Sequence, residues 1–242
     1  KKDQPDTIIK LNVGSGKTLV GLMLLQSSIN DGCGPALYIC PDKQLANQVI
    51  EEAELLGLSV TSDPKDTDFR AGNKICVTNI YKLFNGHSVF GVGPEGIKIG
   101  IGSIIIDDAH ACISTISDQF RLTLPLSHPS YGRILELVAE DLKQQSRPTF
   151  LDLQQSDPRA VMEVPFWSWQ RYQEEILSTL HQHKATEPLI FTYPLISEIL
   201  PQCRCIIGGQ KLEIEPICPP TELIKSFGRA KRRIYMTATL SD

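Results

Sequence analysis

The sequence of 242 residues lacks several features that mark whole classes of protein. No apolar run is long enough to cross a bilayer, and the first residues, KKDQPDT, do not resemble a signal peptide. We therefore expect a soluble, cytoplasmic protein without membrane contact. The chain also lacks an excess of positive charge, since its net charge is −4. This excludes a strongly basic nucleic-acid-binding domain, although it leaves room for a local basic groove.

The seven cysteines lack the C-x-x-C spacing that is typical of metal and redox sites. Only Cys203 and Cys205 are close together, and a metal site built on them and Cys218 lacks a clear fourth ligand. We expect buried free thiols in a reducing compartment.

Short apolar segments alternate with helical patterns through the first half of the chain. Helices are predicted over 17–30 and 42–57, and Asp42 is expected to cap the second one. The predicted strands of this half are DTIIKLN, ALYIC, LSVT, KICVTN and SIIIDD. Short, doubly buried strands separated by helices indicate an α/β fold, with a mostly parallel sheet covered on both faces.

The pattern changes after Asp108, where the chain becomes richer in glutamine, proline and aromatic residues. Strand patterning returns near the end. We therefore predict one α/β domain formed by residues 1–116 and 202–242, interrupted by a mainly helical insertion at 117–201. After Asp108 we expect helices over 131–145, 169–183 and 219–231, a hairpin over 203–217 and a strand over 232–239.

The segment LNVGSGKT at 11–18 lies between a predicted strand and a predicted helix. Its glycines allow a tight turn whose backbone amides, together with the helix start, face an anion. Lys17 would add charge for the outer phosphates, and Thr18 a hydroxyl for Mg²⁺. Leu11 stands where the general motif has its first glycine, which is its least constrained position. The predicted nucleotide-binding residues are Gly14, Ser15, Gly16, Lys17 and Thr18.

The segment SIIIDDAH places two carboxylates at the end of a predicted buried strand. Ligands of open α/β sheets bind at such strand ends. An NTPase needs one carboxylate for the metal and a second to orient the attacking water. We assign Asp107, with Thr18, to Mg²⁺ and Asp108 to the water, so the predicted catalytic residues are Lys17, Asp107 and Asp108.

Taken together, GSGKT, DDAH and MTATL at 236–240 resemble motifs I, II and III of the DEAD/DEAH-box superfamily 2 helicases. The resemblance implies a RecA-like P-loop NTPase domain that uses ATP and Mg²⁺ to move along nucleic acid, with single-stranded DNA favoured over RNA. The insertion between motifs II and III is similar to that of the iron–sulfur DNA-repair helicases, but their cluster cysteines have no counterpart here. A second RecA-like domain is missing from this chain, so we expect weak ATP hydrolysis by it alone.

The resemblance also implies roles for residues outside the nucleotide site. Nucleic-acid contact is implied for two strand ends, at Pro41, Asp42, Gln44, Thr78 and Asn79. Coupling between the nucleotide and nucleic-acid sites is implied for His110, Thr237, Ala238 and Thr239.

Asp108 stands where this family usually has glutamate. The shorter side chain would displace the attacking water by about 1 Å, which can cost about a hundredfold in rate. This leaves an alternative open: a nucleotide-binding switch or scaffold with weak or no unwinding, whose insertion binds a protein partner. A P-loop kinase is disfavoured, because DDAH and TATL have no role in one.

Overall fold

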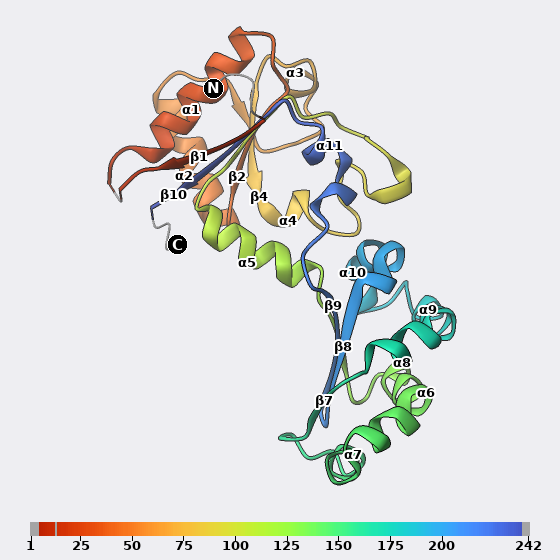
Figure 1. Ribbon diagram of the computed structural model, residues 1–242. Coiled ribbons are helices and arrows are strands. Elements are labelled where there is room, and N and C mark those ends of the chain that lie inside the picture. The colour runs from red at the N-terminus through yellow and green to blue at the C-terminus, as the bar shows by residue number, and fades with distance from the viewer. Residues whose placement is uncertain (1–4, 13, 239–242) are drawn as a thin grey trace. The chain divides into compact units, whose positions relative to one another are not determined.

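The computed structural model describes residues 5–12 and 14–238, and its chain forms two compact units (Figure 1). The first unit contains residues 1–118 and 221–242, and the second contains 119–220. The second segment of the α/β unit thus begins at 221, later than the expected 202.

The first unit contains a six-stranded sheet in the order β1-β10-β5-β2-β4-β3. Every pair of neighbours in it is parallel, as the sequence predicts. Its strands are β1 (Asp6–Lys10), β2 (Ala36–Cys40), β3 (Val60–Thr61), β4 (Ile75–Asn79), β5 (Ser103–Ile106) and β10 (Arg232–Thr237). All residues of β2 and β5 are buried, because both faces of the central sheet are covered.

Helices lie on both sides of this sheet, with α1 and α2 on one side and α4 and α11 on the other (Figure 1). The helices are α1 (Lys17–Asn30), α2 (Lys43–Leu55), α3 (Thr67–Arg70), α4 (Ile80–Leu83), α5 (Ala109–Gln119) and α11 (Lys225–Gly228), with 3-10 turns at Gly93–Glu95 and Thr221–Leu223. On the first side, Leu22 and Leu25 of α1 and Val49 of α2 pack on the strands in one core cluster. The predicted RecA-like α/β architecture is confirmed.

Local signals explain where the two long helices begin and end. The Asp42 side chain accepts a hydrogen bond from the Leu45 amide at 2.8 Å and caps α2, as predicted. Gly32 follows α1 and Gly57 follows α2, and both have a left-handed φ that only glycine adopts easily.

The second unit contains an antiparallel sheet in the order β6-β9-β8-β7. Its strands are β6 (Leu122–Pro125), β7 (Val161–Glu163), β8 (Cys203–Gly208) and β9 (Lys211–Pro216). Its helices are α6 (Pro129–Gln145), α7 (Arg147–Gln154), α8 (Phe166–Arg171), α9 (Gln173–His181) and α10 (Leu189–Ile196), with a 3-10 segment at Ser197–Gln202. Alternate residues of β8 such as Cys205 and Ile207 are buried, which is typical of a sheet with one covered face.

Three details differ from the sequence-based expectations. The hairpin expected in the α/β domain is β8 and β9 of the second unit, because β8 pairs with β7 and β9 with β6. The helix expected over 219–231 is replaced by a 3-10 turn and the four-residue α11, separated by Ile224 with a non-helical ψ of 82°. The helix expected over 169–183 is divided into α8 and α9 at Tyr172.

Within 5–12 and 14–238, no helix combines the length and apolar character that crossing a membrane requires. The same residues contain no group of three or more histidine, cysteine or acidic side chains that could hold a metal ion. All seven cysteines are free.

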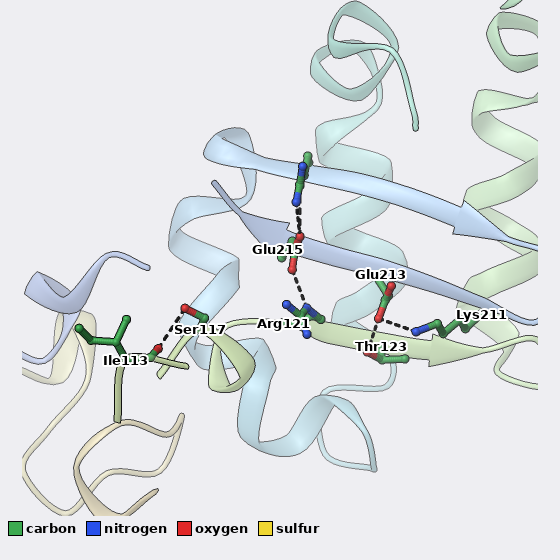
Figure 2. Close-up of polar contacts among 8 residues, drawn as sticks. Ile113, Ser117, Arg121, Thr123, Lys211, Glu213 and Glu215 are labelled. Carbon is green, nitrogen blue, oxygen red and sulfur yellow. Dashed lines mark hydrogen bonds and ion pairs between the residues drawn. The ribbon is translucent and has the colours of Figure 1, made fainter. Parts of the chain in front are cut away.

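Charged side chains pair with one another along and across the sheet of the second unit (Figure 2). Glu215 of β9 pairs with Arg121 at 2.6 Å and with Arg204 of β8 at 2.6 Å. Glu213 of the same strand pairs with Lys211 at 2.8 Å. Burial by itself raises the pKa of Glu215, but hydrogen bonds from the two arginines outweigh it and lower the pKa.

We expect Glu215→Gln to lower the free energy of unfolding by about 1 kcal/mol at neutral pH, because two guanidinium groups lose their shared partner. The lowered pKa fixes the pH dependence. The carboxylate stabilises the fold above its ordinary pKa, and this contribution is lost as the pH falls through the lowered pKa of the folded state. Urea unfolding at neutral pH and at about pH 3 measures the difference, which should shrink in acid. Glu140→Gln, which removes an exposed pair with Lys143, is the control; an equal loss in both variants would contradict the prediction.

Candidate nucleotide and nucleic-acid site

The loop between β1 and α1 has the backbone that a phosphate-binding turn needs. Gly14 and Gly16 have φ values of 78° and 72°, in the left-handed region. A Cβ built on either glycine meets no atom within 4 Å, so space remains open around the loop. The Ser15 amide and hydroxyl both donate to the Asn12 carbonyl, at 3.2 and 2.6 Å. The glycines are therefore required by the backbone conformation and not by close contacts.

The start of α1 offers donors to an anion. Gly16 is the N-cap of this helix, and no side-chain hydrogen bond caps it in the described structure. Lys17 and Thr18, both half-buried, form its first turn. An uncapped helix start presents backbone N–H groups and the positive end of the helix dipole. The arrangement suits the outer phosphates of a nucleotide.

Asp107 and Asp108 follow β5 and have different environments. The half-buried Asp107 carboxylate accepts a hydrogen bond from the Tyr38 hydroxyl at 3.0 Å through Oδ2. Its Oδ1 accepts one from the Asp108 amide at 2.9 Å. Asp108 is exposed and has a φ of 44°, which is uncommon for a residue with a side chain. The Asp107 carboxylate is thus held in orientation by two hydrogen bonds. Asp108, in contrast, has an exposed side chain on a strained backbone.

Strand register brings these segments to one edge of the sheet. Lys10, the last residue of β1, pairs with Thr237 of β10, and Tyr235 of β10 pairs with Ile106, the last residue of β5. Neighbouring strands lie about 4.8 Å apart, so the ends of β1 and β5 are separated by about 10 Å. This spacing is within the span of a triphosphate and its divalent ion.

Thr18 and Asp107 suit a magnesium ion by their chemistry. Both offer oxygen ligands, and Mg²⁺ in nucleotide sites commonly takes one or two protein oxygens, with phosphates and water completing its octahedron. Both oxygens of Asp107 already accept one hydrogen bond each, which leaves further lone pairs for a metal or its water.

The residues predicted to contact nucleic acid lie at the carboxyl ends of β2 and β4, as parallel pairing of these strands requires. Gln44 is exposed and Pro41 is half-buried, while the Asp42 carboxylate caps α2. Asn79 caps α4 by accepting a hydrogen bond from the Lys82 amide at 3.2 Å. Thr78 is only 4% exposed, so its side chain is not accessible for contact. Thr78 is therefore removed from the candidate surface.

Two of the predicted coupling residues line one cavity of about 720 Å³ in the first unit. His110 reaches it from α5 and Thr237 from the end of β10. Ala238 follows directly and is half-buried, whereas Thr239 lies outside the described residues. The rest of the wall is formed mainly by apolar groups such as Ile8, Ile113 and Phe227.

Tyr38 was missed by the sequence analysis. It is a fully buried residue in the otherwise non-aromatic strand β2. Burial, followed by the nearby charge of Asp107, raises the pKa of the Tyr38 hydroxyl. The hydroxyl therefore keeps its proton and donates to Asp107. The available signal was the tyrosine itself, since a buried phenol usually finds a hydrogen-bond partner.

With this geometry established, comparison with known proteins identifies the family. Residues 2–135, more than half of the chain, match the family model of the DEAD/DEAH box helicases. The chain belongs to the DEAD/DEAH box helicase family. Membership confirms the predicted superfamily 2 helicase domain.

Two solved structures share the fold of this chain. A structure of S. tokodaii Xpd4 is 16% identical, with a TM-score of 0.52, and the match covers 97% of this chain and 53% of that one. A structure described as an XPD helicase is 13% identical, with a TM-score of 0.50, covering 97% of this chain and 55% of that one. The chain thus spans about half the length of these structures. No curated protein sequence matches it significantly.

The two loop glycines allow a test of the backbone argument. Gly16→Ala should lower the free energy of unfolding by about 1 kcal/mol, because alanine is disfavoured at this left-handed φ. It should also weaken binding of a fluorescent ATP analogue. Gly100→Ala is the matched control, since its Cβ also meets no atom within 4 Å and its φ lies outside that region. Urea unfolding measures the stability of both variants, and an equal loss of unfolding free energy in Gly16→Ala and Gly100→Ala would refute the argument.

Proposed function

We propose that this chain is the motor domain of an ATP-dependent helicase or translocase that moves along DNA in preference to RNA. The observation that supports the proposal is the parallel register of β1, β10 and β5, which brings the loop before Lys17 and the segment after β5 to the same carboxyl edge of the sheet. Family membership gives the class of reaction.

The side chains at the loop bind and orient ATP. The N–H groups of the loop and of the first turn of α1 donate to the phosphate oxygens, and the Lys17 ammonium neutralises their charge. Thr18 and Asp107 would hold Mg²⁺, whose positive charge would offset the negative charge that develops on the phosphate oxygens.

Asp108 orients the water that attacks the terminal phosphorus and accepts its proton. Its carboxylate is one methylene shorter than the glutamate usual in this family, so hydrolysis is slow. A second RecA-like domain outside this chain supplies further groups that stabilise the transition state. We therefore expect this chain alone to bind ATP but to hydrolyse it slowly.

Single-stranded nucleic acid crosses the strand-end loops at Pro41, Asp42, Gln44 and Asn79. Contact there is made mainly to phosphates through backbone N–H groups and short polar side chains, so it does not depend on base sequence. His110, Thr237, Ala238 and Thr239 connect this surface to the nucleotide. The shared cavity of His110 and Thr237 supports this role.

A nucleotide-dependent switch that binds a protein partner is the second candidate. It is favoured by two aromatic side chains of the second unit, since Phe166 is 71% and Trp167 is 63% exposed. Exposed aromatic residues are enriched in protein interfaces. Weak or absent unwinding by the full-length protein would favour this candidate over a motor.

Two substitutions test the proposed ATPase. Lys17→Ala should weaken binding of an ATP analogue and lower hydrolysis by about a hundredfold or more, as expected when a preorganised cationic donor is lost. Asp108→Asn should retain binding and lower hydrolysis by about a hundredfold or more, because the attacking water loses its base. Hydrolysis is measured by phosphate release with and without single-stranded DNA or RNA.

Lys98→Ala is the matched control, because this exposed lysine precedes β5 and so lies toward the opposite edge of the sheet. It should behave as the unmodified chain. If Lys17→Ala bound and hydrolysed ATP as well as Lys98→Ala, the proposed nucleotide site would be wrong. Equal stimulation by DNA and RNA would remove only the preference for DNA.

A further inference from the structure

Tyr38 lies between two parts of the candidate nucleotide site that are distant in sequence. Its hydroxyl donates to Asp107 Oδ2 at 3.0 Å. Its ring lies against Gly21 of α1, where a Cβ would come within 2.8 Å of Tyr38 Cε2. One buried side chain therefore touches both the helix that begins at Lys17 and the carboxylate that follows β5.

Gly21 makes this close approach possible. It is buried in α1 one helical turn after Lys17. A Cβ at this position would also come within 2.9 Å of Met236 Cε on β10. Because Gly21 has no side chain, α1 packs directly against the ring of Tyr38. The ring therefore sets the distance between α1 and the ends of the neighbouring strands.

The hydrogen bonds of Asp107 give the hydroxyl a distinct role. Oδ1 is held by the amide of Asp108, the next residue, which constrains it only locally. The Asp107 backbone is held by its own amide, which donates to the Ile39 carbonyl at 2.8 Å, and by Cys112 Sγ, which donates to its carbonyl at 3.2 Å. Of these four bonds, only that from Tyr38 orients the carboxylate from a different strand.

We propose that Tyr38 is a positioning residue of the nucleotide site, which fixes the Asp107 carboxylate for Mg²⁺ through its hydroxyl and fixes α1 relative to it through its ring. The inference rests on the proposed function. Groups that hydrogen-bond to a metal ligand fix its orientation, and their loss typically costs about 10- to 100-fold in metal affinity. Tyr38 therefore acts through Asp107 and contacts neither nucleotide nor metal.

Tyr38→Phe tests the hydroxyl alone, since it keeps the ring and its packing. The Mg²⁺ concentration needed for half-maximal binding of a fluorescent ATP analogue should rise about tenfold. Binding of the same analogue in EDTA should not change, because the loop and Lys17 are untouched. Tyr131→Phe is the matched control: Tyr131 is also buried and donates to the Gly208 carbonyl at 2.9 Å, within the second unit. Thermal unfolding of both variants checks that each one folds.

The outcomes separate this inference from the proposed function. If the unmodified chain bound the analogue neither with nor without Mg²⁺, the proposed function itself would fail. If it bound with a clear Mg²⁺ dependence that Tyr38→Phe left unchanged, the positioning role would be overturned and the proposed function would stand. An equal shift in Tyr131→Phe, or weaker binding of Tyr38→Phe in EDTA, would also overturn it, because either result would indicate a general loss of stability.

Discussion

The parallel pairing of β1 with β10, and of β10 with β5, is the constraint on which the candidate site depends. It brings the carboxyl ends of all three strands to one edge and places one strand between the phosphate loop and the acidic pair. A register shift of one residue would turn every side chain of a strand to the opposite face. Met236 of β10 opposes such a shift, because it is fully buried on the face of the sheet that packs against Gly21 of α1. Core packing thus fixes the spacing of polar groups that lie outside the core.

Asp108 has a strained backbone conformation where this edge meets a loop. Gly14 and Gly16 adopt left-handed conformations at little cost, but Asp108 adopts one with a carboxylate side chain. Its carbonyl accepts the Cys112 amide at 3.0 Å, and the buried β5 and α5 constrain it on either side. Strained residues persist only where surrounding structure holds them, and they gather at functional sites. The strain at Asp108 is therefore consistent with a carboxylate aimed at a ligand and held there by its neighbours.

Local sequence signals made the first unit largely predictable, but contacts between residues distant in sequence could not be predicted. Asp42 predicts the start of α2, and the glycine-rich turn with Lys17 predicts a phosphate loop, because each signal acts within a few residues. The β8–β9 hairpin was recognised but placed in the α/β domain, since its pairing partners are distant in sequence and its own pattern does not name them. Tyr38 was missed for the same reason: its hydroxyl meets a carboxylate 69 positions away. Thr78 was assigned by its place at a strand end, and that place could not reveal that packing buries its side chain.

Contacts between these parts also indicate how a displacement of the phosphate loop would reach other residues of the first unit. The Leu11 amide donates to the Thr237 carbonyl at 3.1 Å, so the loop is tied to the end of β10 where it leaves β1. Thr237 shares a cavity wall with His110, two residues after Asp108. Tyr38 adds a second connection, through α1 and Asp107. Because a closely packed interior transmits small displacements, a shift of the phosphate loop must be accommodated at both places. The proposed coupling would thus depend on a hydrogen bond at the sheet edge and on a tyrosine ring beneath the helix. Each joins the loop before α1, or α1 itself, to the acidic pair or its neighbours.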